Sequence, residues 1–280
     1  MSNVQIYTVA EDLKSLLELE KAKGGTIGFV PTMGALHDGH LSLVKRCKDE
    51  NSLCVVSIYV NPRQFNESDD FANYPRQIEV DREKLETLGG LVLFLPTSED
   101  LFNVNFASPK VDLMGLDQRL EGASRPGHFQ GVMDVVYALF NLVHPSKAYF
   151  GLKDFQQVAV VQNMVGKLSL PVEIVPVPTL REASGLAMSS RNQLLSLSQQ
   201  EEATLLYKTL CFVRDNIKSI PLSHILASAQ ELFSASLLQL DYLVVVDPTT
   251  LLPLTEYQEN AHCCIAAYLG KVRLIDNMAL

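Results

Sequence analysis

The chain has 280 residues, of which 47% are hydrophobic and 20% charged, and its formal net charge is −9 at pH 7. This length suits one large domain or two of ordinary size, and the composition excludes a disordered or fibrous protein. The negative charge disfavours a general affinity for nucleic acid, although a local basic site for phosphates stays compatible with it. We therefore expect a globular protein with no nucleic-acid partner.

The cysteines and the apolar segments indicate in which cellular compartment the protein is located. The five cysteines show no CxxC spacing, so we expect no disulfide framework and no zinc site. We also expect a reducing environment. The run His262-Cys263-Cys264 resembles metal ligands, but it continues into an apolar stretch that is typical of a buried strand. No signal peptide is evident, and the most apolar stretch, residues 132–143, is too short to span a bilayer. We predict a cytoplasmic protein with no membrane partner.

Short apolar segments alternate with segments of helical period through the first two thirds of the chain. The pattern predicts strands at residues 26–30, 53–60, 91–95 and 147–150. It predicts helices at residues 41–50, 77–88, 131–143 and 155–168. Apolar strands with helices between them indicate a parallel sheet covered on both faces. We expect an α/β fold, with a Rossmann-like, doubly wound parallel sheet over residues 1–176.

The pattern changes after residue 176. Pro171, Pro176 and Pro178 interrupt this passage, and a helix is then predicted at residues 198–217. Strands follow at residues 242–246, 263–269 and 271–275, and the turn at Gly270 and Lys271 suggests an antiparallel hairpin. We expect residues 177–280 to form a smaller C-terminal α+β domain.

Polar residues gather directly after three of the predicted strands. They are PTMGALHDGH at residues 31–40, NPRQF at residues 61–65 and GLKDFQQ at residues 151–157. Ligands of open parallel sheets bind beyond the carboxyl ends of the strands. These three clusters are therefore the candidates for a ligand-binding site.

The first cluster places two histidines at the start of a helix. His37 and His40 are three residues apart, so both rings can face one side of the helix. A helix N-terminus suits phosphate, and imidazole donors there would stabilise the charge on a leaving pyrophosphate. The alternative is a capped helix start, with Asp38 as the N-cap and both histidines solvated.

The second and third clusters provide neutral amides and a cation. Asn61 and Gln64 can bind a carboxylate or hydroxyl without neutralising it, which matters if the carboxylate is the nucleophile. Lys153 supplies a positive charge, and Asp154 would orient it or bind a ribose hydroxyl. The alternatives are an Asn-Pro turn in the second cluster and an Asp-capped helix start in the third.

A fourth cluster lies near the expected domain boundary, at residues 181–192. Ser189 and Ser190 are followed by Arg191, and two hydroxyls beside an arginine form a compact phosphate clamp. A loop of this kind could close over ATP. The alternative is a polar loop between domains that carries an ordinary surface arginine.

These stretches resemble a known family. The HxGH and MSSR stretches are similar to the HIGH and KMSKS signatures of the class I aminoacyl-tRNA synthetase superfamily of nucleotidyltransferases. The full set resembles the pantoate–β-alanine ligase family: PTMGALHDGH, YVNPRQF, YPR at residues 74–76, RPGHFQGV at residues 125–132, GLKDFQQ, and LAMSSRNQLLS at residues 186–196. The resemblance implies that pantoate and ATP form pantoyl adenylate and pyrophosphate, and that β-alanine then gives pantothenate and AMP. It also implies Mg²⁺ with the ATP phosphates and a homodimer.

The resemblance also implies roles for individual residues. His40 is the implied catalytic donor, assisted by His37, Lys153, Ser189, Ser190 and Arg191. The implied ATP-binding positions are Met33, Gly34, Ala35, Leu36, His37, Asp38, Gly39, His40, Gly151, Leu152, Lys153, Asp154, Leu180, Met188, Ser189, Ser190 and Arg191. The positions implied for pantoate and β-alanine are Asn61, Gln64, Gln157, Tyr74, Arg125 and His128.

Several positions depart from the family pattern. Leu152 stands where Glu is common, Ser184 where Asp is common, and Leu180 where Val is common. Arg63 stands where a neutral residue is usual, and it adds a cation beside the implied pantoate site. Asp81 is expected on a solvated helix face, and no protein ligand of Mg²⁺ is assigned.

Other functions stay open at this point. An adenylyltransferase of the same superfamily would transfer AMP to a phosphate, and would favour cations at Gln64 and Gln157. A tRNA synthetase is disfavoured by the charge and the short chain. A nucleotide sensor without catalysis is disfavoured by the joint presence of His37, His40, Lys153 and Arg191.

Overall fold

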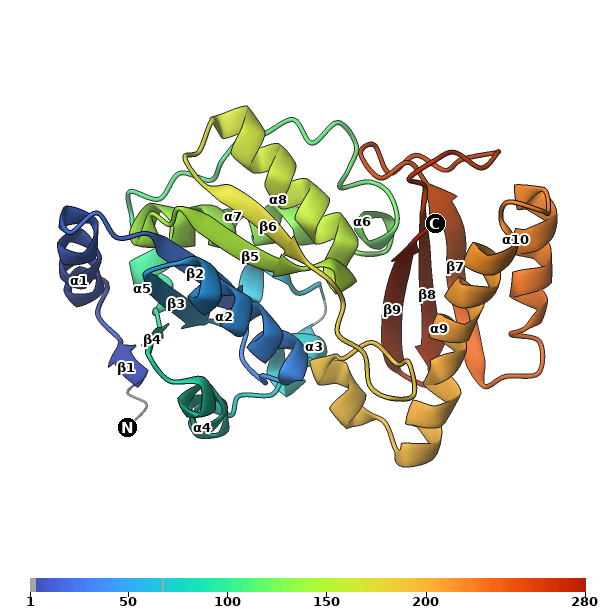
Figure 1. Cartoon of the computed structure of the whole chain (residues 1–280), viewed down its shortest axis with the longest axis horizontal. Coiled ribbons are helices and arrows are strands. Elements are labelled where there is room, and N and C mark those ends of the chain that lie inside the picture. Colours follow the sequence, from blue (N-terminus) through green and yellow to red (C-terminus); the bar gives the residue numbers. More distant parts are fainter. Residues whose placement is uncertain (1–3, 67) are drawn as a thin grey trace. The chain divides into compact units, whose positions relative to one another are not determined.

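The chain forms two compact units, described here for residues 4–66 and 68–280 in a computed structural model (Figure 1). The first unit comprises Met1–Leu152 and Gln157–Pro178. The second comprises Lys153–Gln156 and Thr179–Leu280, so four residues after the fifth strand belong to the C-terminal unit.

The first unit is built on a parallel six-stranded sheet. Its strands are β1 (Val4–Tyr7), β2 (Ile27–Thr32), β3 (Leu53–Ile58), β4 (Leu91–Phe94), β5 (Lys147–Gly151) and β6 (Glu173–Val177), in the order β1-β4-β3-β2-β5-β6. All neighbouring strands pair in parallel. The strand order reverses between β2 and β5, so the carboxyl ends of these two strands flank the point where ligands of such sheets bind.

The helices between these strands follow the apolar periodicity of the sequence. They are α1 (Ala10–Ala22), α2 (Asp38–Glu50), α3 (Ser68–Asn73), α4 (Ile78–Leu88), α5 (Ser98–Leu101), α6 (Glu121–Ser124), α7 (His128–Val143) and α8 (Phe155–Leu168), with short 3-10 turns η1 (Pro62–Gln64) and η2 (Leu152–Asp154). In Figure 1, α2 lies in front of the sheet and α7 behind it, and both contact β2. Because both faces are covered, strand residues such as Phe29 and Val55 are fully buried.

The second unit contains a three-stranded antiparallel sheet, β7 (Leu238–Val246), β8 (His262–Leu269) and β9 (Val272–Ala279), in that order. The helices α9 (Leu197–Asn216) and α10 (Leu222–Glu231) and the 3-10 turn η3 (Ser190–Leu194) complete it. Leu269 pairs with Val272 across the two-residue turn, and Gly270 has φ +61°, so the predicted hairpin is confirmed. The α/β class with a smaller α+β part is likewise confirmed.

The strands that the sequence pattern missed lie at the two edges of the parallel sheet. Pro176 lies within β6, which is an edge strand where a missing N–H is tolerated. Its presence made the passage look like a break. β1 forms the other edge and leaves Ile6 exposed, so it lacks the fully apolar pattern of a central strand. Over residues 4–66 and 68–280, no helix is long and apolar enough to cross a membrane.

Candidate active site

The turn between β2 and α2, residues 33–37, is held through its main chain by α4. The fully buried Asp81 accepts hydrogen bonds from the main-chain N–H groups of Ala35 (2.8 Å) and Leu36 (2.7 Å). One helical turn later, Lys84 Nζ donates to the carbonyl of Leu36 at 2.5 Å. The expectation of a solvated helix face at Asp81 is therefore wrong, because its carboxylate satisfies two buried N–H groups of the turn.

Sharp backbone geometry accompanies these bonds. Gly34 has φ +81° and Ala35 has φ +51°, and a Cβ atom on Gly34 would lie 3.0 Å from Asp81 Oδ2. The turn therefore requires glycine at this position. The bonds to Asp81 and Lys84 fix the backbone of this turn.

The two histidines of the HxGH stretch lie together at the start of α2. Their ring centroids are 4.1 Å apart, as the three-residue spacing predicts. His37 is the N-cap residue, so the alternative that Asp38 caps this helix is wrong. The His37 N–H donates to His40 Nδ1 at 3.3 Å. Nδ1 of His40 is thus an acceptor, and the neutral ring carries its proton on Nε2, which becomes a donor.

Gln64 ends η1, directly after β3, and its side chain is oriented by two neighbours. Asn61 Nδ2 donates to Gln64 Oε1 at 3.1 Å, and Gln64 Nε2 lies 2.9 Å from Met33 Sδ as a donor. Asn61 is fully buried, and its Nδ2 also donates to the carbonyl of Gly131 in α7. The amide of Gln64 therefore adjoins the turn after β2, and the amide of Asn61 fixes it there.

The main-chain carbonyl of Gln64 is held as firmly as its side chain. The buried His128 donates from Nδ1 to this carbonyl at 2.6 Å, because a carbonyl oxygen can only accept. Nε2 of His128 is then an acceptor, and Arg125 Nη1 lies 3.4 Å from it. Arg125 Nη2 donates to the same carbonyl of Gln64. Arg125 and His128, both predicted to bind substrate, thus hold the backbone of Gln64, a third such residue.

Tyr74 lies beside the residue that follows Gln64, and Gln157 lies on α8. The Tyr74 ring packs edge-on against Phe65, the residue after Gln64, with centroids 5.7 Å apart. Gln157 is half-buried in the first turn of α8.

The guanidinium of Arg63 turns to a different set of partners from those of Gln64. Arg63 Nη1 pairs with the buried carboxylate of Asp134 at 2.8 Å and lies over the Phe102 ring, 4.2 Å from its centroid. Asp134 also accepts from Ser108 and Gln130. The extra cation expected beside the pantoate site is therefore paired with a carboxylate of α7.

The second unit carries the lysine of the third cluster. Lys153 Nζ lies 3.7 Å from Asp154 Oδ1, and the lysine side chain is largely buried, whereas that of Asp154 is half exposed. The main-chain carbonyl of Lys153 accepts a hydrogen bond from Asn277 Nδ2 of β9 at 2.8 Å. Gly151 ends β5 and Leu152 begins η2, both half-buried.

The segment that ends in the MSSR stretch is a closed hairpin followed by η3. The N–H of Met188 donates to the carbonyl of Leu180, and Arg181 pairs with Ala187 in an antiparallel bridge. We call residues 180–188 the 180–188 hairpin. Ser189 is the N-cap of η3, and its Oγ accepts from the N–H of Arg191 at 3.3 Å. The buried Asn192 ties η3 back to the hairpin by donating to the carbonyl of Ala187.

Sequence reasoning missed the residues that support these segments. Asp81, Asp276 and Asn277 carry no motif, and only Asp81 gave a usable signal, since a carboxylate four residues before the buried Leu85 falls on the apolar face of α4. Among the residues that the structure describes, no group of three or more His, Cys, Asp or Glu side chains could hold a metal ion.

Comparisons with known proteins agree with this arrangement. The family described as pantoate-beta-alanine ligase matches residues 5–279 of the chain. The chain belongs to this family. It is 44% identical to the pantothenate synthetase of Fervidobacterium nodosum, over 99% of each chain. The predicted activity, an ATP-dependent ligase that joins pantoate to β-alanine through a C–N bond, is confirmed at the level of the family.

Solved structures show the same fold. A crystal structure of pantoate–β-alanine ligase from Thermus thermophilus superposes with a TM-score of 0.92 at 42% identity, covering 98% of this chain and 99% of that one. The Francisella tularensis ligase complexed with beta-gamma ATP and β-alanine gives a TM-score of 0.79 at 35% identity, covering 99% of this chain and 98% of that one.

The close packing of α7 on η1 gives a test of how Gln64 is positioned. A Cβ atom on Gly131 would lie 2.2 Å from the carbonyl oxygen of Arg63 and 2.8 Å from the N of Gln64. Gly131→Ala should therefore displace η1, destabilise the fold by about 1–3 kcal/mol and lower kcat/KM for pantoate by about 10²-fold. Thermal melting and steady-state kinetics measure both effects.

A helical glycine in α8 provides the control. A Cβ on Gly166 would meet nothing within 4 Å, so Gly166→Ala should be neutral or stabilise by up to about 1 kcal/mol. A Gly131→Ala protein with the stability and the kcat/KM for pantoate of the wild type would show that η1 does not set the position of Gln64.

Proposed function

We propose that this chain activates pantoate as its adenylate at the residues described above, and that β-alanine then takes the acyl group. A carboxylate oxygen of pantoate would attack the α-phosphorus of ATP, and pyrophosphate would leave with the electrons of the broken P–O bond. The amine of β-alanine would then attack the acyl carbon, lose a proton and displace AMP. The contact between Gln64 Nε2 and Met33 Sδ carries the proposal, because it brings a neutral, acid-binding amide to the turn proposed to bind ATP.

The first step needs placement and charge stabilisation more than covalent chemistry. His40 would donate from Nε2 to the phosphates, a role that the acceptor state of its Nδ1 supports. His37, Lys153, Ser189, Ser190 and Arg191 would share the remaining charge. The order of the strands on either side of β2 supports a Rossmann-like site for the nucleotide at residues 33–40.

For four of the predicted substrate residues we propose a positioning role. Asn61 is fully buried with its amide bonded to protein atoms, and Arg125 and His128 bond the carbonyl of Gln64. Tyr74 packs on the adjacent Phe65. These four would act through Gln64, whereas Gln64 and Gln157 would contact pantoate.

We propose that Mg²⁺ arrives with the phosphates of ATP, whose charge it neutralises. Mg²⁺ commonly keeps several waters and binds substrate phosphates, so it does not require a cage of protein ligands. Asp81 is unsuited to bind it, because this carboxylate is buried and both of its oxygens accept main-chain N–H groups.

A homodimer in the cytoplasm completes the proposal. The homodimer rests on the resemblance to the family, and light scattering of the purified protein measures it. The cytoplasmic location is supported by the five free thiols. Burial raises the pKa of the Cys263 thiol to about 12, so this thiol stays protonated and has a packing role.

The choice of acid separates this function from its rivals. Purified protein with ATP, Mg²⁺ and pantoate should release pyrophosphate, and addition of β-alanine should yield AMP and pantothenate. Pyrophosphate release with nicotinamide mononucleotide or phosphopantetheine, but not with pantoate, would identify an adenylyltransferase. ATP binding without turnover of any of these acids would identify a sensor.

Gln64→Glu tests the acid-binding amide, since it keeps the size and introduces a negative charge. Repulsion of the pantoate carboxylate should raise the KM for pantoate by about tenfold or more, which needs about 1.4 kcal/mol, and should leave the KM for ATP almost unchanged. Steady-state kinetics with each substrate varied in turn measure this. The exposed Gln258→Glu controls for added charge.

Arg63→Ala in the same background tests where the neighbouring cation acts. Because Arg63 is paired with Asp134, its effect on the pantoate KM should add to that of Gln64→Glu. A double variant much worse than the sum would show that Arg63 reaches the acid. An unchanged pantoate KM in both backgrounds would remove Gln64 from the acid site.

A further inference from the structure

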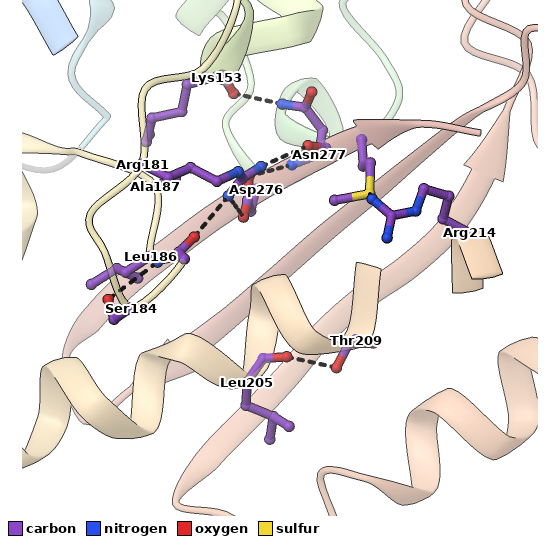
Figure 2. Close-up of polar contacts among 12 residues, drawn as sticks. Lys153, Arg181, Ser184, Leu186, Ala187, Leu205, Thr209, Arg214, Asp276 and Asn277 are labelled. Carbon is purple, nitrogen blue, oxygen red and sulfur yellow. Dashed lines mark hydrogen bonds and ion pairs between the residues drawn. The ribbon is translucent and has the colours of Figure 1, made fainter. Parts of the chain in front are cut away.

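Two segments proposed to handle the phosphates of ATP are fixed to adjacent residues of β9, Asp276 and Asn277. Figure 2 shows Asn277 bonded to the main-chain carbonyl of Lys153, while the lysine side chain extends away from the asparagine. It also shows Asp276 bonded to Arg181, the second residue of the 180–188 hairpin. Adjacent residues of a strand point to opposite faces, which lets Asp276 and Asn277 reach two different segments.

The orientation of the Asn277 amide is fixed by its partners. Its Nδ2 must face the carbonyl of Lys153, which can only accept, so its Oδ1 faces His262 Nε2 at 2.8 Å. His262 is therefore the donor in that bond. Burial lowers the pKa of His262, which keeps the ring neutral in this bond.

His262 also holds the residue that begins α8. Its ring stacks on that of Phe155 with centroids 3.8 Å apart and an interplanar angle of 3°. The main-chain carbonyl of Lys153 is thus held by a hydrogen bond, and two residues later the ring of Phe155 is held by stacking. Both contacts come from the antiparallel sheet of the second unit, and together they define the path of the backbone at Lys153.

The contact between Asp276 and Arg181 is a buried, two-pronged ion pair. Nη1 and Nη2 of Arg181 donate to the two carboxylate oxygens at 2.6 and 2.9 Å, and the side chains are 17% and 3% exposed. The same guanidinium donates to the carbonyls of Gly185 and Asn277 and lies 4.3 Å from the centroid of the Tyr207 ring. Nη1 and Nη2 of Arg181 therefore each donate to two protein acceptors, which leaves neither nitrogen a hydrogen for a nucleotide. These bonds fix the 180–188 hairpin, which Ser189 follows.

We propose that Asp276 and Asn277 are positioning residues for adenylation, which set the place of Lys153 relative to residues 188–191 before ATP binds. The inference rests on the proposed roles of Lys153 and of Ser189 to Arg191. Neither residue of the pair is proposed to touch substrate. Their effect is exerted through one main-chain carbonyl and one arginine, both within the second unit.

Asn277→Asp tests the first contact while keeping the size of the side chain. The new oxygen would face the carbonyl of Lys153 in place of an N–H donor, and the two acceptors would repel. A backbone shift of about 1 Å can cost about 10²-fold in rate, so pyrophosphate formation at saturating ATP should fall by about 10- to 100-fold. The KM for ATP should rise. The KM for pantoate should stay within about twofold of the wild type, because Asn277 acts through Lys153, which is proposed to bind ATP and not pantoate. Asn277→Ser, which removes the bond without repulsion, should show the same pattern if the aspartate variant does not fold.

Asn216→Ala is the matched control. Asn216 Nδ2 also donates to a main-chain carbonyl at 2.8 Å, that of Phe212 in α9, in the same unit. A purely structural role for Asn277 predicts that both variants lose thermal stability and keep wild-type kinetics in the folded protein. Equal kinetic effects in the Asn277 and Asn216 variants would overturn the inference, and so would wild-type kinetics in both Asn277→Asp and Asn277→Ser.

Asp276→Asn tests the second contact, with Asp241→Asn as its control. Asp241 receives two donors from Arg273, the nearer at 2.8 Å, in the same sheet but outside the hairpin. Asp276→Asn should slow pyrophosphate formation and raise the KM for ATP, whereas Asp241→Asn should leave both unchanged. Equal behaviour of the two variants would remove Asp276 from the positioning pair.

Lys153→Ala separates failure of this inference from failure of the proposed function. A large loss of pyrophosphate formation in Lys153→Ala, together with normal kinetics in the Asp276 and Asn277 variants, overturns only the positioning role. Normal turnover by Lys153→Ala would overturn the role proposed for the lysine itself, and the positioning role with it.

Discussion

Main-chain groups in the segments after the strands need hydrogen-bond partners, and buried polar side chains from distant elements provide them. Asp81 of α4 accepts two N–H groups of the turn after β2, and His128 of α7 donates to the carbonyl of Gln64 after β3. In the second unit, Asn277 of β9 donates to the carbonyl of Lys153 after β5. The Asp81 bonds fix the turn that precedes His37 and His40, and the other two fix the backbone of Gln64 and Lys153, whose own side chains are assigned to substrate binding and chemistry.

The energetics of these bonds are asymmetric. A satisfied hydrogen bond contributes about 1 kcal/mol net, whereas a buried group left without a partner costs about 1–3 kcal/mol. Alternative paths of these loops are therefore penalised before any ligand binds. Donors and acceptors fixed in this way need little reorganisation when charge develops on a leaving pyrophosphate, which is the condition for electrostatic stabilisation of a transition state. The scaffold thus contributes to the reaction by holding a few backbone atoms still.

The local parts of this arrangement could be predicted from the sequence, and the long-range parts could not. Apolar runs of four to eight residues and the polar clusters behind them identified β2, β3 and β5 and the residues that follow, because strand period and turn chemistry are local properties. Asp81 bonds a turn 46 and 45 residues away in the chain, and Asn277 bonds a carbonyl 124 residues away. The spacing of Asp81 from Leu85 indicates that its carboxylate is buried but not which groups it binds, and no local pattern distinguishes Asn277 from a solvated asparagine. The same limit applies to Arg63, whose partner Asp134 is 71 residues distant.

Amide hydrogen exchange of the ligand-free protein tests most directly whether buried side chains hold these segments in advance. The N–H groups of Ala35 and Leu36 should be protected to nearly the degree of the neighbouring strand β2, because both donate to Asp81. Asp81→Asn should remove the protection of at least one of the two N–H groups, since an amide presents only one acceptor oxygen, while Glu79→Gln at an exposed position of the same helix should leave both protected. Exchange of these two amides in the wild type as fast as in an exposed loop would contradict the account.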